Sequence, residues 1–508
     1  MIIHRTGAKQ WVNRHETFVQ PIADLYDLGN RNSGDALADY NDATKGIQGI
    51  IKEAIDTGRE LRAVGGEWSW TKIAATDGIL LNTKPLNLSF RIGQHNLSTA
   101  YTNSPDGLYF AQCGVSVKEV NDRLRKHGRS LRTTGASNGQ TIVGAMSTGT
   151  HGAAIDVGSI PDYVVGLHII TSPTKHIWLE RSSYPVVSAT FAGKLNTQIV
   201  QDDDLFNAAV VSFGSFGFIH GVLLESDPLF LYEAYRVKLP VNDTLFQLME
   251  TLDFTDSLLP NGSERPYHFQ VLINPYDNKN EAYVTTMYKR PFDAGYKPPP
   301  AFKPGLGPGD DAPTFIGAIT SLLPAVVPAM VSKLVAASCA PYGKTTGCHA
   351  DFFTNTDTHG KVMSMAIGVP ASVVRKVTDM LVELNKEEGP FAGVFAYRFV
   401  KGTAATLGFT RFSVTCIIEL DGVFSGPTNH FYQAFWKALI KENIPHTFHW
   451  GKIFEADDAH LRHMYSDKSV NQWLMARKQI LEEESCRKVF TNALMRHWQL
   501  DRSDGLVA

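Results

Sequence analysis

The alternation of apolar and polar positions predicts helices and strands in turn along the first half of the chain. Apolar residues recur at helical spacing over 44–58 and again over 115–127, which predicts two amphipathic helices. Short apolar runs at 60–64, 79–82 and 108–111 predict strands. Strands and helices that alternate with glycines between them are typical of an α+β nucleotide-binding domain.

A different pattern begins after about Ser226. Strands of alternating polarity are predicted at 267–274, 282–288, 394–399 and 412–420. Helical patterns such as 372–386 lie between them, which predicts a sheet with helices on one side. Such a layer would cover the first domain as a substrate domain, and ligand pockets favour junctions of this kind.

The stretch 134–152, TGASNGQTIVGAMSTGTHG, is rich in glycine, serine and threonine. A loop of this composition offers main-chain N–H groups to an anion such as a phosphate. A second candidate loop, GGEWSWT at 65–71, directly follows a predicted strand. Each alone is equally consistent with a turn between strands, so neither is decisive without its context.

Composition excludes several classes of protein. The chain has 508 residues, of which 43% are hydrophobic, and this length predicts two or three domains. The net charge of −3 comes without a basic block, so a nucleic-acid partner is not expected. The five cysteines show neither CxxC nor another metal-ligand spacing, which predicts buried thiols and no metal site. The N-terminus has no secretion-type apolar core, and we expect a soluble, cytoplasmic protein.

One apolar segment stands apart from this pattern. Residues 314–340 are strongly apolar but interrupted by Pro324 and Pro328, too broken to span a bilayer comfortably. We expect a pair of short helices packed in the substrate domain. The alternative is a lid that touches a membrane or admits a lipophilic substrate.

Six segments in order resemble a known family. They are RAVGGEWSWTKIA, ILLNTKPLN, FAQCGVSVKEVNDRLRKHGRSLRTTG, TIVGAMSTGTHG, VSFGSFGFIHGV and FHWGKIF. Together they resemble the vanillyl-alcohol-oxidase-type flavoproteins with a PCMH-type FAD-binding domain, and are most similar to the sugar, aldonolactone and alditol oxidase branch. The helical pattern at 470–481 and the segment 489–492 resemble the family's final helix and its Phe-x-Asn segment.

The resemblance implies an α+β fold in which a two-part FAD-binding domain carries an inserted α+β substrate (cap) domain. The boundaries expected on this basis are a lead-in at 1–42, the FAD-binding domain at 43–227, the substrate domain at 228–435 and a returning segment at 436–508.

It also implies FAD as cofactor and names the residues that contact it. The diphosphate is expected on Gly65, Gly66, Trp68 and Ser69. The residues expected along the cofactor from diphosphate toward flavin are Gly144, Ser147, Thr148, Gly149, His151 and Gly152, and Ile219 is expected at the adenine end. Two buried phosphates without a basic cluster need many neutral N–H donors, which glycine loops supply.

The first loop departs from the family at one position. Many relatives carry a histidine there that is bonded to the flavin, whereas this chain has Trp68, and an indole cannot form that bond. Noncovalent FAD is therefore expected. His151 is expected to bond or pack near the flavin; the alternatives are a covalent link there or a purely structural histidine.

In this branch a Glu-x-Arg pair and a motif lysine surround the substrate. Arg398 and Lys452 match these positions, but Ala396 stands where the glutamate is expected. Arg398 and Lys452 would stabilise negative charge, and His449 or Tyr397 would accept the proton. Arg398 is alternatively a plain sheet arginine.

The resemblance implies an oxidase that takes a small-molecule C–OH substrate and passes electrons to oxygen. The alternatives are a dehydrogenase or oxidase for a lipophilic or natural-product substrate, and a protein that binds FAD without catalysis.

Overall fold

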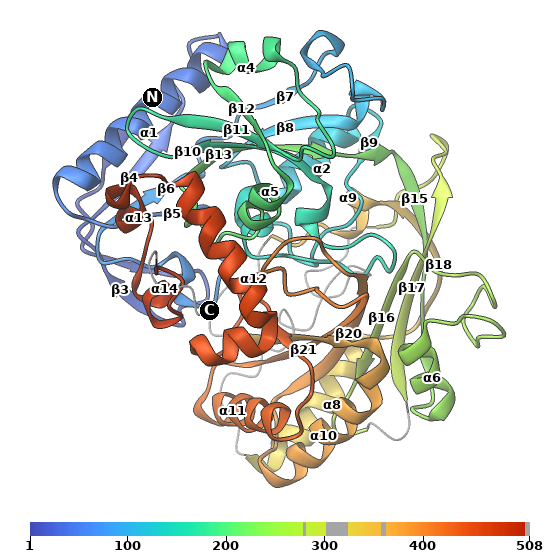
Figure 1. Cartoon of the computed structure of the whole chain (residues 1–508). Helices are drawn as coiled ribbons and strands as arrows, with labels where there is room; N and C mark the ends of the chain where they lie inside the picture. Colours follow the sequence, from blue (N-terminus) through green and yellow to red (C-terminus); the bar gives the residue numbers. More distant parts are fainter. Residues whose placement is uncertain (278–280, 301–323, 357–361, 503–508) are drawn as a thin grey trace.

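The computed structural model describes residues 1–277, 281–300, 324–356 and 362–502. Two units are stacked in it, each built on a large sheet. In Figure 1 the six-stranded sheet and helix α1 occupy the upper half, and the eight-stranded sheet with helices α8, α10 and α11 occupies the lower half. This arrangement confirms the predicted α+β class.

The N-terminal unit contains a four-stranded and a six-stranded sheet. The four-stranded sheet has the order β1 (Ile2–Arg5), β4 (Asp24–Gly29), β6 (Ile79–Asn82), β5 (Leu61–Val64). The six-stranded sheet has the order β12 (Gln198–Gln201), β11 (His176–Glu180), β10 (Val164–Ile170), β13 (Phe218–Glu225), β8 (Leu108–Gln112), β7 (Ser89–Arg91). Two small ribbons join β2 (Gln10–Val12) to β3 (Val19–Pro21) and β9 (Arg129–Ser130) to β14 (Asp227–Pro228). Residues 1–42, expected as a lead-in, supply two strands of the first sheet.

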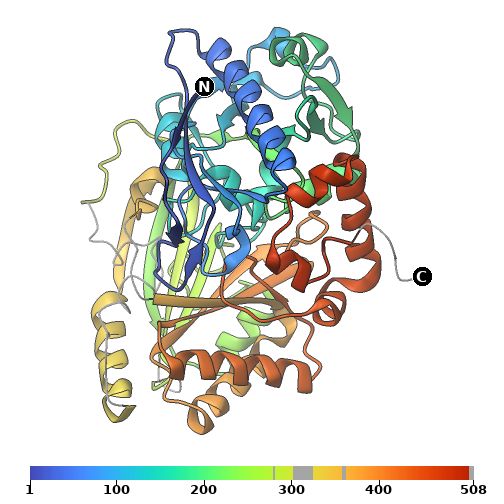
Figure 2. The ribbon, with the colours of Figure 1, turned by 90° about the vertical axis from the view of Figure 1, so that its left-hand side faces the viewer.

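Helix α1 (Ala36–Asp56) packs between these two sheets (Figure 2). Its apolar face, which includes Ile47 and Ile51, is buried against both sheets. The helix begins before the predicted residue 44 because the Asp35 carboxylate accepts hydrogen bonds from the first free amides. The other helices of the unit are α2 (Val117–Arg125), α3 (Ile142–Ser147), α4 (Ala189–Leu195) and α5 (Asp203–Ala209).

The second unit is an antiparallel sheet of eight strands. Its order is β18 (Tyr342–Cys348), β15 (Phe230–Leu239), β17 (Ala282–Pro291), β16 (His268–Ile273), β20 (Gly393–Lys401), β21 (Val414–Val423), β19 (Val362–Pro370), β22 (Thr447–Phe448). Its helices are α6 (Asp243–Thr251), α8 (Val327–Ser338), α9 (His349–Phe352), α10 (Val374–Glu387) and α11 (Gly426–Lys441).

Different parts of the protein pack on the two faces of this sheet. One face packs on α6, α10 and α11, through residues such as Val271, Phe395 and Ile418. Alternate residues of the same strands point the other way, toward the N-terminal unit, because successive side chains of a strand alternate. At one end of that inner face α8 packs on Leu272 and Val394.

The described part of the apolar segment 314–340 is a 3-10 turn, Pro324–Val326, followed by α8; residues 314–323 lie outside the described part of the chain. Over the described residues, no helix combines the length and apolar character needed to cross a membrane.

The C-terminal segment returns to the N-terminal unit. Helix α12 (Asp458–Ile480) crosses the middle of the molecule (Figure 1), with a kink at Ser466. The indole of Trp473 donates to the Val211 carbonyl at 3.1 Å. Helices α13 (Glu484–Val489) and α14 (Ala493–His497) follow, and Val489 and Phe490 join the core around α1.

Candidate active site

A cavity lies between the glycine loops of the N-terminal unit and the inner face of the eight-stranded sheet. Its empty space is about 1600 Å³, which includes solvent at its mouth. Its lining comes from both units, as expected for a ligand site at a domain junction. One end is lined by Phe218 and Phe490, and the other by Arg398 and Lys452.

Most of the residues expected to contact FAD line this cavity. They are Gly65, Gly66, Trp68, Ser69, Gly144, Ser147, Thr148, His151 and Ile219.

Gly149 and Gly152 do not line it. Gly149 takes φ +76° at the turn after α3, which favours glycine. A Cβ on Gly152 would lie 2.1 Å from Thr133 Oγ1, so packing within the protein requires this glycine.

Polar groups on the cavity wall fit a large polar ligand. Trp68 Nε1 and Gln140 Oε1 are buried and, among the described residues, have no hydrogen-bond partner. The amides of Gly66 and Trp68 likewise have no acceptor in the described part of the chain. Buried donors and acceptors are costly to leave unpaired. A ligand with oxygen acceptors would therefore supply the missing partners of the donors on this wall. FAD, with its diphosphate, is such a ligand.

A cation that the sequence did not reveal also lines this cavity. Arg62, on β5, is 3% exposed and donates to the carbonyls of Ile73, Phe213 and Gly214. Burial lowers the pKa of Arg62 to about 10, which leaves it charged at neutral pH. Its positive charge therefore favours an anionic ligand in the cavity.

The far end of the cavity carries a charged cluster on two neighbouring strands. Arg398 on β20 and Glu419 on β21 are almost completely buried, and Arg398 Nε lies 3.2 Å from Glu419 Oε2. Glu419 pairs in register with Ala396. The carboxylate expected at position 396 is therefore supplied by the neighbouring strand.

Lys452 joins the same cluster from the loop after β22. Its Nζ lies 3.5 Å from Glu419 Oε1 and donates to Ser364 Oγ at 2.7 Å. Ser364 in turn donates to Asp421, a carboxylate with no exposure. Burial opposes ionisation of Glu419, but Arg398 and Lys452 outweigh it and hold its pKa well below the usual range.

The cluster thus holds equal numbers of acidic and basic side chains, Glu419 and Asp421 with Arg398 and Lys452.

Two residues expected to accept a proton are placed differently. Tyr397 lies on the opposite face of the sheet, where its hydroxyl is 3.0 Å from Thr378 Oγ1 of α10. Because successive strand residues alternate in direction, Tyr397 cannot share the cavity with Arg398. His449 does line the cavity, but its Nδ1 accepts from the Gly451 amide at 3.0 Å. Neutral His449 therefore carries its proton on Nε2 and acts there as a donor.

A comparison with known protein families shows which kind of domain contains the glycine loops. Residues 42–180 match a family described as FAD binding domain. The matched range includes both glycine loops, at 65–71 and 134–152. The match confirms the cofactor and the PCMH-type domain expected from the motifs.

Curated relatives match about half of the chain. The chain is 27% identical over 258 residues to the L-gulono-1,4-lactone dehydrogenase of Mycobacterium tuberculosis, covering 51% of this chain and 50% of that protein. It is 24% identical over 228 residues to a putative D-arabinono-1,4-lactone oxidase of Neurospora crassa, covering 45% of this chain and 32% of that protein. The matches span half or less of these curated relatives.

The fold has a close counterpart among solved structures. The crystal structure of cholesterol oxidase from B. sterolicum superposes with a TM-score of 0.66 at 15% identity, over 98% of this chain and 97% of that chain. At this identity the similarity is one of fold. It extends the correspondence beyond the FAD-binding domain to the second unit.

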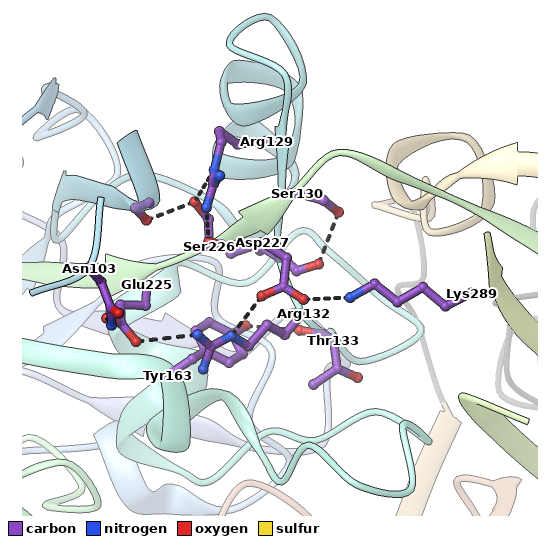
Figure 3. A network of polar contacts seen from close by, with 12 residues as sticks. Asn103, Arg129, Ser130, Arg132, Thr133, Tyr163, Glu225, Ser226, Asp227 and Lys289 are labelled. Atoms are coloured by element: carbon purple, nitrogen blue, oxygen red, sulfur yellow. Dashed lines mark hydrogen bonds and ion pairs between the residues drawn. The ribbon is translucent and has the colours of Figure 1, made fainter. Parts of the chain in front are cut away.

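A network of ion pairs joins the FAD-binding domain to the eight-stranded sheet where the chain passes between them (Figure 3). Asp227 Oδ1 lies 3.1 Å from Arg132 Nε and Asp227 Oδ2 lies 2.6 Å from Lys289 Nζ of β17. Arg132 also pairs with Glu225 at 3.2 Å. Arg132 begins the loop whose residues Gly135 and Ser137 line the cavity, so the network fixes one wall of the FAD site relative to the second unit.

Glu419, Asp421 and Arg62 were missed from the sequence. A signal was present for the two acids, because they stand two residues apart in the otherwise apolar strand TCIIELDGV and must share a face. In the described part of the chain, no group of three or more His, Cys, Asp or Glu side chains is placed to hold a metal ion.

Proposed function

We propose that the protein is an FAD-dependent oxidoreductase that oxidises a C–OH group of a small molecule. The observation that carries this proposal is the buried cluster of Arg398, Glu419 and Lys452 at one end of a cavity whose other walls are those of an FAD-binding domain. Buried charges are costly to maintain, and a protein that only stored FAD would have no use for them at this end.

Each member of the cluster has a role in such a reaction. Arg398 and Lys452 stabilise negative charge that develops on the substrate oxygen as its proton leaves. Glu419 holds both cations in place and accepts a hydrogen bond from the substrate. The Nε2–H of His449 donates into the same space. Bound FAD supplies the hydride acceptor.

The relatives favour a polar substrate of the aldonolactone or alditol type. Both curated relatives named above act on sugar lactones according to their names. A cluster with equal numbers of acidic and basic side chains also favours an uncharged polyol or lactone over an acid, because an added carboxylate would disturb the balance. We propose oxygen as the electron acceptor and noncovalent attachment of FAD, the latter because Trp68 occupies the linking position.

A second candidate is an oxidase of lipophilic alcohols. The observation that favours it is helix α8, which covers the same sheet face that carries Arg398 with the apolar residues Val327, Val331 and Val335. A lipophilic substrate would enter along the apolar residues of α8. The fold shared with cholesterol oxidase is compatible with it.

The test is the flavin absorbance of the purified protein under anaerobic conditions. Alditols, aldonolactones, sterols and long-chain alcohols are added separately, and air is then admitted. We expect an aldonolactone or alditol to bleach the flavin band and air to restore it quickly. Bleaching only by sterols or long-chain alcohols would favour the second candidate, slow recovery in air would favour a dehydrogenase, and no bleaching by any alcohol would contradict the proposed function.

A further inference from the structure

His151 occupies a special place at the substrate end of the cavity. It follows the turn after α3, lines the cavity and is 3% exposed. Its ring meets Phe409 edge-on, with ring centres 5.3 Å apart, and lies 5.9 Å from the ring of His449. Its Nε2 faces Glu419 Oε1 across 4.0 Å.

The hydrogen bonds fix the tautomer of His151. Its Nδ1 lies 2.9 Å from the carbonyl oxygen of Gly152, which can only accept, so Nδ1 carries the proton. In the neutral ring Nε2 then bears a lone pair. His449 is locked the opposite way by the Gly451 amide. The two histidines thus present one acceptor and one donor nitrogen to the same space.

The gap between His151 Nε2 and Glu419 Oε1 suits a hydroxyl group. Both atoms are acceptors, and at 4.0 Å they do not bond to each other; a hydroxyl held between them donates its one proton to one of them, and its oxygen accepts from a nearby donor. Lys452 Nζ, 3.5 Å from the same carboxylate oxygen, can donate to that bound oxygen. A substrate hydroxyl between them would have its proton directed at an acceptor and its oxygen facing a cation.

We propose that His151 Nε2 is the base that takes the hydroxyl proton of the substrate. This inference rests on the proposed function and names the proton acceptor within it. As the O–H bond breaks, its proton passes to Nε2 and its electron pair forms the carbonyl, while the breaking C–H bond releases a hydride that bound FAD would accept. The alcohol is oxidised by two electrons and the flavin is reduced by two.

The surrounding charges support this assignment over Glu419. Glu419 is held ionised by Arg398 and Lys452, which makes it a weak base. Burial lowers the pKa of His151 to about 4; Glu419 raises it, whereas Arg398 and Lys452 lower it. His151 is therefore neutral well above pH 4 and, although burial weakens it as a base, it remains the stronger base of the two; Glu419 stabilises the imidazolium that forms.

The tautomer can be measured on the FAD-loaded protein without any turnover. In ¹⁵N NMR spectra of protein labelled at histidine, the His151 signals are assigned by their loss in His151→Gln. We expect a protonated Nδ1 and an unprotonated Nε2 at pH 7. A proton on Nε2 would overturn the inference, whether or not the protein proves to oxidise alcohols.

The rate of flavin reduction tests the chemical role. The substrate is whichever alcohol of the panel bleaches the wild-type flavin fastest. His151→Ala should keep FAD but reduce it about 10²–10⁴-fold more slowly, and added imidazole should restore the rate in proportion to its free-base concentration. A wild-type rate, or a slow rate that imidazole does not restore, contradicts the assignment.

His446 provides the matched control. It is buried, its Nδ1 also bonds to a carbonyl, that of Ile444 at 2.7 Å, and burial lowers its pKa to about 4, but it lies outside the cavity. His446→Ala should reduce flavin at the wild-type rate with or without imidazole. Failure of the proposed function would show as no bleaching of the wild-type flavin, a result independent of the tautomer measurement.

Discussion

Glu419 and Ala396 face each other across β21 and β20 as an in-register pair. The Cβ atoms of such pairs lie about 4.5–5.5 Å apart on one face of the sheet, so a glutamate at either position reaches the same space. A carboxylate that relatives are expected to carry beside Arg398 on one strand can therefore be supplied from the next strand. The exchange preserves the ion pair with Arg398.

This exchange can be tested by reversing it. Glu419→Ala should slow flavin reduction by about 10²–10³-fold, because Arg398 and Lys452 lose the charge that positions them. The double variant Ala396→Glu with Glu419→Ala returns a carboxylate to the same space and should recover most of that loss. Anaerobic stopped-flow measurement of flavin reduction, at equal FAD content, gives both values. If Glu419→Ala reduces flavin as fast as the wild type, Glu419 has no role in the reaction.

Trp68 carries a second prediction at the scale of the residue. Its indole lines the cavity, and the family resemblance aligns it with the histidine that many relatives bond to flavin. Acid precipitation of the protein should therefore release the yellow cofactor into the supernatant. Colour that stays in the pellet would show a covalent bond, and mass spectrometry of the flavin peptide would then identify the residue.

The sequence reveals some site residues and hides others for a physical reason. Arg398 and Lys452 belong to local motifs, and the glycines of the loops at 65–69 and 144–152 can be recognised from neighbours in the chain. The partnership of Glu419 with position 396 depends on strand register, which is decided by long-range pairing. Arg62 stands in a short apolar strand, and only the fold brings the carbonyls of 213 and 214 to it.

At the scale of elements, the crossing from β13 to β15 determines how the two units meet. β14 pairs with β9, and the side chain of Asp227, the first residue of β14, bonds to Arg132 of the FAD-binding domain and Lys289 of the second unit. The cationic side chain of each pair, Arg132 or Lys289, is about one-third exposed. Each pair therefore contributes much less to the free energy of unfolding than a buried pair would. Their value is that one carboxylate connects both units.

Removal of this charge should loosen the junction modestly. Asp227→Asn is expected to lower the free energy of unfolding by about 1 kcal/mol, measured by urea titration of the FAD-loaded protein. Asp56→Asn is the matched control, because Asp56 forms one exposed pair with Lys52 at 2.6 Å on a single helix. That control should stay within about 0.5 kcal/mol of the wild type. Equal effects of the two variants would show that the Asp227 network does not couple the units.

The spacing of apolar residues predicted the middle of the helices better than their ends. The helix predicted over 44–58 is real, but its first turns, which include Asp39 and Asn41, are too polar to show a helical stripe. The helical pattern at 470–481 is the last part of α12, whose earlier half is separated by the kink at Ser466. Strand order in the eight-stranded sheet joins segments far apart in the chain and could not be read from any local pattern.

At the scale of the whole molecule, the fold buries many histidines. Among the described residues, burial lowers the pKa of seven histidines with buried rings, in both units: His151, His168, His220, His268, His349, His446 and His449. His168, for example, bonds to Tyr40 and to His176, and His220 bonds to Thr44 and Gln112. None of these contacts needs a charged ring.

This burial makes stability depend on pH with a definite sign. In the unfolded chain a histidine has a pKa near 6.5, whereas His151 and His446 in the folded protein have pKa values of about 4. Between these values the unfolded chain binds more protons, so the stability present above about pH 6.5 is lost as pH falls toward 4. Each such group contributes up to about 1.4 kcal/mol per pH unit in this window.

We therefore expect the free energy of unfolding to fall steeply between pH 6.5 and 4.5 and to change little between pH 7 and 8. Urea titrations across this range measure it directly. His446→Phe removes one buried titrating ring outside the cavity and should make the slope shallower by about one proton. A slope that is flat below pH 6.5, or that His446→Phe leaves unchanged, would mean that the buried rings become protonated without unfolding the protein.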